Sequence, residues 1–136
     1  MGLRRKGRES ALQMIYQMDL SGVDAEAATR LYWENLAASR EGEEFANELV
    51  AGVGREDARI DETIRRVSEN WRVERMARVD LSILRLCTYE LLEMKDVPRR
   101  VTLNEGVELA KRYGHENSAG FVNGVLDRIA NDVGKE

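Results

Sequence analysis

Residues 96–129, DVPRRVTLNEGVELAKRYGHENSAGFVNGVLDRI, decide the fold because they contain two helix signals in succession. Pro98 cannot lie inside a helix and disfavours helical backbone just before it, so one helix must end there and another begin. Thr102 and Glu105 have the spacing of a capping box, and Gly114 can take the positive φ that often ends a helix. The first helix is therefore predicted to start at Thr102 and to end at Gly114.

The second helix is predicted to start at Ser118, whose side chain suits an N-cap. Its apolar residues recur at helical spacing, at Val122, Val125, Leu126 and Ile129. We interpret Gly124, which interrupts this stripe, as a point of close approach to a neighbouring helix, most simply the one at 79–94. Phe121 lies beside the stripe, so the pattern leaves it open between the core edge and a partly exposed position near Asn117 and Asn123.

Five more helices precede this stretch. They are predicted at about 9–21, 24–39, 43–53, 57–71 and 79–94, separated by short Gly-containing or Asp-containing turns. The last is the most apolar and should be central, whereas the fourth has a narrow stripe that ends at Trp71. No strand alternation is visible. The sequence therefore predicts one all-α domain over 1–136, with about seven helices and a soft boundary between two subbundles near 71–76.

Composition restricts the class of protein further. The 136 residues are 43% hydrophobic and 34% charged with one proline, which is typical of a helix-rich globular protein. No apolar run approaches the roughly 20 residues that a membrane span needs, so we expect a cytoplasmic protein that does not enter membranes. The single cysteine, Cys87, lies between leucines and is predicted to be a small buried apolar residue.

Positive charge is concentrated at the N-terminus. Residues 1–8 contain Arg4, Arg5, Lys6 and Arg8 and no acid, and the remaining chain carries 17 basic and 25 acidic side chains. The whole chain has a net charge of −4, which argues against indiscriminate coating of nucleic acid. Because Gly7 weakens a helix, residues 1–10 are predicted to form a basic, flexible arm that could become ordered on binding.

Catalytic signals are weak. His115 is the only histidine and is predicted to lie in an exposed turn, without the companions that a zinc site or a triad needs. Gly52 and Gly54 follow no strand, so they do not form a nucleotide-binding loop. The sequence therefore predicts no enzyme activity, no metal site and no cofactor.

Nucleic-acid binding is better supported. Four cations within five positions can neutralise several phosphates, which gives affinity without sequence preference. A solubilising tail is the alternative reading of the same residues. Sequence preference for RNA requires groups that stack on or hydrogen-bond to unpaired bases, and Phe121 with its polar neighbours could supply them.

Three segments resemble the NusB family of bacterial transcription antitermination proteins. They are RRKGRESALQMIYQMDL at 4–20, RVDLSILRLCTYEL at 78–91 and DVPRRVTLNEGVELAKRYGHENSAGFVNGVLD at 96–127. The resemblance implies an all-α fold of two packed three-helix-type subbundles. It also implies a non-catalytic role in which the protein and NusE, a ribosomal small-subunit protein, bind the single-stranded boxA element of nascent ribosomal RNA, so that RNA polymerase reads through terminators.

The same resemblance assigns residues to two surfaces. The RNA-contacting residues it implies are Arg4, Arg5, Lys6, Arg8, Arg85, Asn117, Ser118 and Phe121. The face for the NusE-type partner is expected around Tyr16 and Asp80. Gly7 departs from the alanine expected in the arginine-rich motif, which argues against a preformed helix there.

Two other classes stay open. A NusB-like module of a ribosomal RNA cytosine methyltransferase shares this fold, but no nucleotide-binding domain follows in the sequence. A purely structural oligomerisation bundle would explain the helices but would leave the basic N-terminus without a role. The sequence does not fix the oligomeric state, and a homodimer would be compatible with it.

Overall fold

The computed structural model describes residues 2–68 and 70–136, and all the regular structure in those residues is helical. The elements are α1 (Leu3–Ser21), α2 (Ala25–Leu31), η1 (Tyr32–Leu36), α3 (Glu43–Arg55), α4 (Asp57–Val67), η2 (Val73–Arg75), α5 (Arg78–Glu93), α6 (Arg99–Tyr113) and α7 (Ser118–Asp132). This confirms the prediction of an all-α fold with about seven helices.

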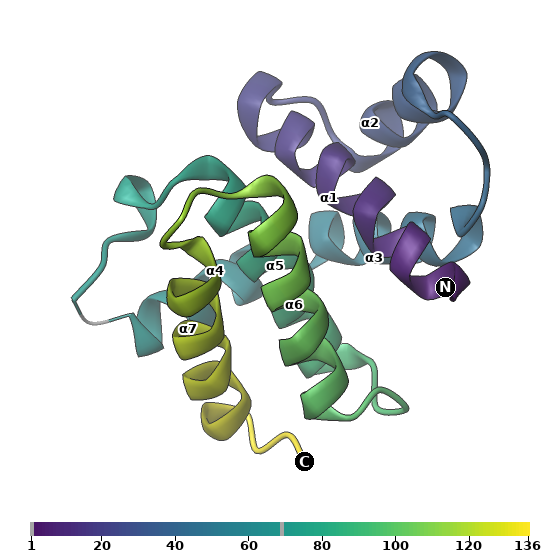
Figure 1. The fold of residues 1–136 in the computed structure, drawn as a ribbon. Helices are drawn as coiled ribbons and strands as arrows, with labels where there is room; N and C mark the ends of the chain where they lie inside the picture. Colours follow the sequence, from purple (N-terminus) through teal and green to yellow (C-terminus); the bar gives the residue numbers. More distant parts are fainter. Residues whose placement is uncertain (1, 69) are drawn as a thin grey trace.

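The helices form two groups that share α5. Figure 1 shows α1, α2 and α3 on one side and α4 to α7 on the other, with α6 and α7 side by side. α1 packs on α3 and α5, and α5 also contacts α4, α6 and α7. α3 makes little contact with α4, the next helix along the chain. The soft boundary near 71–76 stays a prediction.

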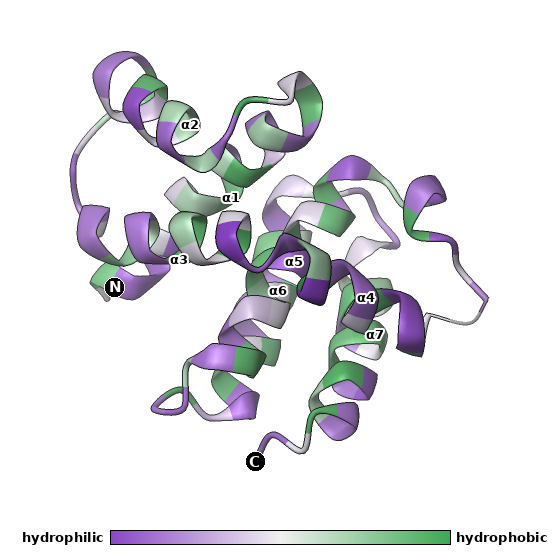
Figure 2. Ribbon diagram, turned by 180° about the vertical axis from the view of Figure 1, so that it is seen from behind, coloured by the Kyte–Doolittle hydropathy of each residue, from purple (hydrophilic) through white to green (hydrophobic). Residues whose placement is uncertain are grey.

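α5 is central because nearly its whole circumference is apolar or small. Eleven of its residues are buried, including Leu84, Leu86 and Cys87, which have no exposed surface. The other helices carry one apolar stripe each, which Figure 2 shows as green and purple alternating along the ribbons. α5 therefore lies inside the molecule, with the other helices around it.

Glycine and aspartate end or begin several helices as predicted. Gly22 takes φ 77° after α1, and its N–H donates to the carbonyl of Met18. Asp24 caps α2 by accepting a hydrogen bond from the amide of Ala27 at 2.9 Å. α2 continues into the π-helical turn η1, which ends at Leu36, so the second predicted helix is shorter than expected.

The predicted start of α6 is wrong, whereas its predicted end at Gly114 is confirmed. α6 begins at Arg99, three residues before Thr102, so Thr102 and Glu105 do not form a capping box. Both side chains contact other helices instead. Gly114 has φ −92°, which is not left-handed, and it is needed because a Cβ there would lie 2.5 Å from Ser118 Oγ.

The predictions for α7 also need correction. Asn117, and not Ser118, is the N-cap residue. A Cβ added at Gly124 would meet nothing within 4 Å, so this glycine is not a helix contact. Close approach occurs at Gly106 in α6, where a Cβ would lie 2.8 Å from Leu126 Cδ1 and 3.1 Å from Cys87 Sγ.

We expect Gly52→Ala and Gly124→Ala to change stability in opposite directions. A Cβ at Gly52 would overlap the buried ring of Tyr89 in α5, so the substitution should lower the free energy of unfolding by about 1–3 kcal/mol. A Cβ at Gly124 would meet open space, so Gly124→Ala should raise the free energy of unfolding by about 0.5–1 kcal/mol. Urea denaturation measures both, and a change of the same sign in both variants would contradict the packing described.

Candidate functional site

The basic N-terminal segment is helical from Leu3 onward, so the prediction of a flexible arm is wrong. Gly7 explains why. It is buried where α1 crosses the start of α3, and a Cβ there would lie 2.9 Å from the carbonyl oxygen of Gly42 and 3.2 Å from the amide of Ala46. Gly7 therefore permits the contact that holds this turn of helix, and packing more than offsets its low helix propensity.

Arg8 is a buried residue and not a surface cation. Its guanidinium donates to both oxygens of Glu90 in α5, from Nε to Oε2 at 2.7 Å and from Nη2 to Oε1 at 2.8 Å. Thr102 Oγ1 donates to Glu90 Oε1 at 3.0 Å. Arg8 is 3% exposed and Glu90 0%. Arg8 therefore joins α1 to α5 and α6, and its assignment as an RNA contact needs correction.

The charged form of Arg8 is nevertheless favoured. Burial opposes the positive charge, but the hydrogen bonds and charge of Glu90 outweigh it, so the pKa of Arg8 is raised. The nearby Cys87 thiol is fully buried, and burial raises its pKa well above the usual value. Cys87 is thus a buried small residue, as predicted.

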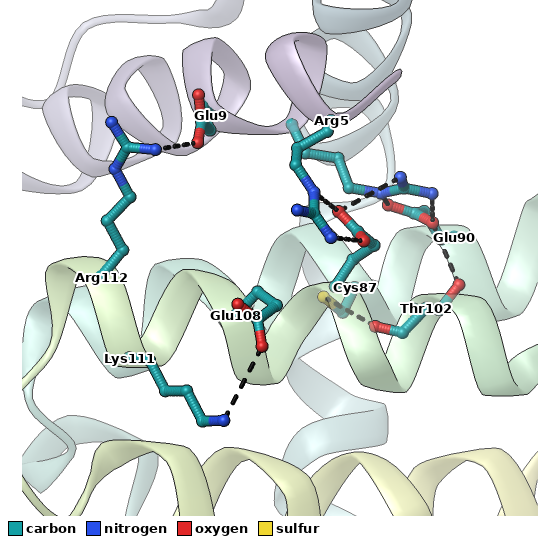
Figure 3. Close-up of polar contacts among 10 residues, drawn as sticks. Arg5, Glu9, Cys87, Glu90, Thr102, Glu108, Lys111 and Arg112 are labelled. Atoms are coloured by element: carbon teal, nitrogen blue, oxygen red, sulfur yellow. Dashed lines mark hydrogen bonds and ion pairs between the residues drawn. The ribbon is translucent and has the colours of Figure 1, made fainter. Parts of the chain in front are cut away.

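Arg5 binds Glu105 in α6 through two hydrogen bonds, from Nε to Oε1 at 3.1 Å and from Nη2 to Oε2 at 2.7 Å. Figure 3 shows Arg5 near Glu90 and Thr102. The hydrogen bonds from Arg5 lower the pKa of Glu105, which therefore stays charged at neutral pH. Arg5 is half-buried, so only part of its charge faces outward.

A hollow of about 260 Å³ lies between α1 and α6, and the exposed Lys6 is part of its lining, whereas the exposed Arg4 binds Asp96 outside it. Charged side chains of both signs line it, and they are Arg5, Lys6, Glu9, Glu105, Glu108, Lys111 and Arg112. Arg112 binds Glu9 at 2.8 Å and Lys111 lies 3.7 Å from Glu108, as Figure 3 shows. The exposed cations of α1 and α6 therefore border one groove.

Lys111 and Arg112 were missed from the sequence. Their only signal is a pair of adjacent cations in the last turn of a helix, which the helix dipole favours in any protein.

The RNA-contacting residues predicted near the start of α7 differ in exposure. Asn117 is exposed, whereas Ser118 is fully buried and its Oγ accepts a hydrogen bond from the amide of His115 at 3.0 Å. Ser118 is thus a structural residue and not a surface contact. Phe121 is half-buried, and its ring meets the ring of Trp71 edge to face at 5.6 Å between centroids. Trp71 itself lies outside α4 and is 57% exposed, contrary to its predicted place in a buried stripe.

Arg85 does not lie on the same surface as the N-terminal cations. Its guanidinium binds Asp61 through two hydrogen bonds of 2.9 and 3.0 Å and Asp19 at 3.1 Å. Asp19 also binds Arg78. Arg85 therefore links α1, α4 and α5 within a hollow that is rich in carboxylates. Its assignment to RNA binding stays a prediction that these ion pairs do not support.

Tyr16 and Asp80, the residues expected at a partner face, differ in exposure. Tyr16 is half-buried and lines an apolar hollow of about 290 Å³ with Leu12, Leu31, Leu36, Val79 and Tyr113. Leu31 and Leu36 are 43% and 68% exposed. Asp80 is 3% exposed and its Oδ2 lies 3.5 Å from Nε2 of the exposed His115, so it can supply negative charge below the surface but little contact area.

Within residues 2–68 and 70–136, no cluster of three or more His, Cys, Asp or Glu side chains has the arrangement to hold a metal ion. In the same part of the chain, every helix is too short or too polar to cross a membrane.

The fold and this surface together define a small helical protein that presents cations from α1 and α6 beside one groove and an apolar hollow along the middle of α1. A model of the NusB family matches residues 5–131. The transcription antitermination protein NusB of Sorangium cellulosum is 50% identical over 135 residues, which are 99% of this chain and 96% of that protein. The chain belongs to the NusB family.

Solved structures agree with this. NusB of T. maritima is 39% identical, with a TM-score of 0.83 over 95% of this chain and 91% of that one. A chain from a complex of antitermination factors NusB and NusE with double-stranded RNA is 28% identical, with a TM-score of 0.83 over 96% of this chain and 97% of that one. The family resemblance that the sequence indicated is therefore confirmed.

We expect Glu90→Gln to lower the free energy of unfolding by about 3–5 kcal/mol, because it removes the only carboxylate that accepts hydrogen bonds from the buried Arg8 among the described residues. The matched control is Asp96→Asn, which removes the exposed partner of Arg4 and should cost less than about 1 kcal/mol. Thermal and urea unfolding measure both. Equal losses in the two variants would show that the Arg8–Glu90 pair is not a structural anchor.

Proposed function

We propose that this protein is a transcription antitermination factor that binds the boxA element of nascent ribosomal RNA together with a NusE-type ribosomal protein. The observation that carries the proposal is the rigid presentation of Arg4 and Lys6, on a helix that the buried Arg8–Glu90 pair fixes, in a chain of the NusB family. The protein acts by binding and not by catalysis, in the cytoplasm and within the RNA polymerase antitermination complex.

The RNA backbone follows the cations that border the groove between α1 and α6. Lys6 and Lys111 are exposed there, and Arg112 is exposed while it binds Glu9. Arg4 is exposed on the same helix as Lys6, where it binds Asp96. Phosphates can compete for these side chains because surface ion pairs are weak. Asn117 and Phe121, near the start of α7, supply contacts to bases.

The partner protein docks at the apolar hollow around Tyr16. Exposed leucines beside a hollow lined by aromatic rings are typical of the centre of a protein interface. Beyond residue 8 the chain carries a formal charge of −8, which favours a basic partner. A surface shared by RNA and partner would make their binding cooperative.

The expected outcome for Arg4→Ala combined with Lys6→Ala is weaker binding of all single-stranded RNAs and a flatter salt dependence. Loss of two phosphate contacts should reduce the slope of log K against log salt by about 1.4. Fluorescence anisotropy over a salt series measures this. The control is Arg30→Ala, which removes an exposed cation from α2 and should leave the slope unchanged.

Sequence preference is tested in the same assay with a boxA-like RNA and a scrambled RNA, each with and without the NusE-type protein. The proposal requires the boxA-like RNA to bind more tightly when the partner is present. Equal binding of the two RNAs in the presence of the partner would contradict it.

A further inference from the structure

Trp71 is an aromatic residue whose side chain is largely exposed. It lies between α4 and η2 and is 57% exposed, whereas the other tryptophan, Trp33, is 8% exposed and donates a hydrogen bond to Asn47. Among the described residues, the other exposed large apolar side chains are all leucines. An exposed indole is a group that commonly binds a partner or ligand.

The indole is held in place despite its exposure. The Trp71 amide donates to the carbonyl of Ser68 at 3.0 Å, which forms a turn after α4. The ring meets Phe121 of α7 at 5.6 Å and 75°, an edge-to-face contact between segments that are 50 residues apart in sequence. The Phe121 ring thus packs against the indole and helps to hold it in place. Trp71 is the more exposed of the two rings.

Two polar hollows of about 450 and 430 Å³ flank Trp71. Ser68 and Asn70 line both of them, with Arg128 and Asn131 in one and Arg65 and Arg72 in the other. Ser68 is only 5% exposed, and its Oγ has no hydrogen-bond partner in the part of the chain that the structure describes. A buried hydroxyl without a partner indicates a place where a ligand can supply one.

Among the described residues that line the two hollows, three arginines accompany two carboxylates. The acidic groups in the two hollows, Asp132 and Glu74, are already bound to Arg66 and Arg65. Arg72 and Arg128 are both exposed, and neither forms an ion pair within residues 2–68 and 70–136. The cations nearest Trp71 thus remain available to an anionic ligand.

We propose that Trp71 is a stacking platform for an unpaired base of single-stranded RNA, with Arg72 and Arg128 binding the phosphates on either side. Stacking on an indole accepts any base, because every base has a π face. The platform extends the RNA surface beyond Phe121 to the segment that follows α4. This inference rests on the proposed RNA-binding function.

A protein partner fits this surface less well. Most residues that line the hollows are polar or charged, whereas the centre of a protein interface is depleted of charge. Aromatic rings flanked by arginines are typical of single-stranded nucleic-acid sites.

The test uses the intrinsic fluorescence of Trp71. In a Trp33→Phe variant Trp71 is the sole tryptophan, and a boxA-like single-stranded RNA of about 12 nucleotides, within the range of known site sizes, should quench its emission. In a Trp71→Phe variant the remaining Trp33 should not respond to the same RNA. If RNA does not quench Trp71 and the NusE-type protein alone does, the surface is a protein-docking site and the inference is overturned.

Affinity gives a second readout. Trp71→Ala should weaken RNA binding by about 10- to 100-fold, whereas Trp71→Phe should keep most of the affinity because it keeps a ring. Leu20→Ala, which removes another exposed apolar side chain, is the matched control and should have no effect. Thermal unfolding of each variant verifies that the fold is retained.

The two proposals fail in distinguishable ways. If the wild-type protein binds no RNA with or without the partner, the proposed function fails and the platform with it. If the wild type binds RNA while Trp71→Ala binds equally well and Trp71 emission does not change, only the platform is overturned.

Discussion

The structure depends on the buried ion pair between Arg8 and Glu90. The two residues are 82 positions apart, and their double hydrogen bond fixes α1 on α5 while Thr102 of α6 donates to the same carboxylate. A buried carboxylate that lacked these partners would be costly, so α1, α5 and α6 must assemble together. This pair therefore defines where the first turns of α1 lie.

The position of α1 in turn sets the functional surface. With Arg8 directed inward and Arg5 bound to Glu105, the same helical turns leave Arg4 and Lys6 exposed. Lys6 lines the same groove as Lys111 of α6, and Arg4 binds Asp96. Glu105 also lies 3.9 Å from Arg8, so it couples the surface pair to the buried one. A preformed array of cations loses little conformational entropy when it binds RNA, which favours affinity.

Local patterns in the sequence predicted the helices well, because apolar periodicity and residues such as Gly22 and Asp24 act within a few positions. The errors arose where a residue serves a distant contact. Thr102 has the spacing of a cap but binds Glu90, and Gly7 appeared to weaken a helix that its contact with Gly42 stabilises. No sequence pattern shows which glycine packs against another helix. The sequence indicates Gly124 as the close contact between helices, whereas the structure has this contact at Gly106.

The site was predicted less well for a related reason. A charged residue in a sequence suggests an exposed side chain. Arg8 and Asp80 are nevertheless buried, and Arg85 binds two carboxylates, which only the packing of the helices reveals. Trp71 shows the opposite error, since its apolar character predicted burial.

Amide hydrogen exchange at residues 7–10 in the isolated protein tests the central claim most directly, because these N–H groups are bonded only if α1 is helical from Leu3. The account predicts that they are protected without RNA and that Glu90→Gln removes much of this protection. Exchange at the rate of an unfolded chain in the wild type, with protection gained only after RNA is added, would contradict it.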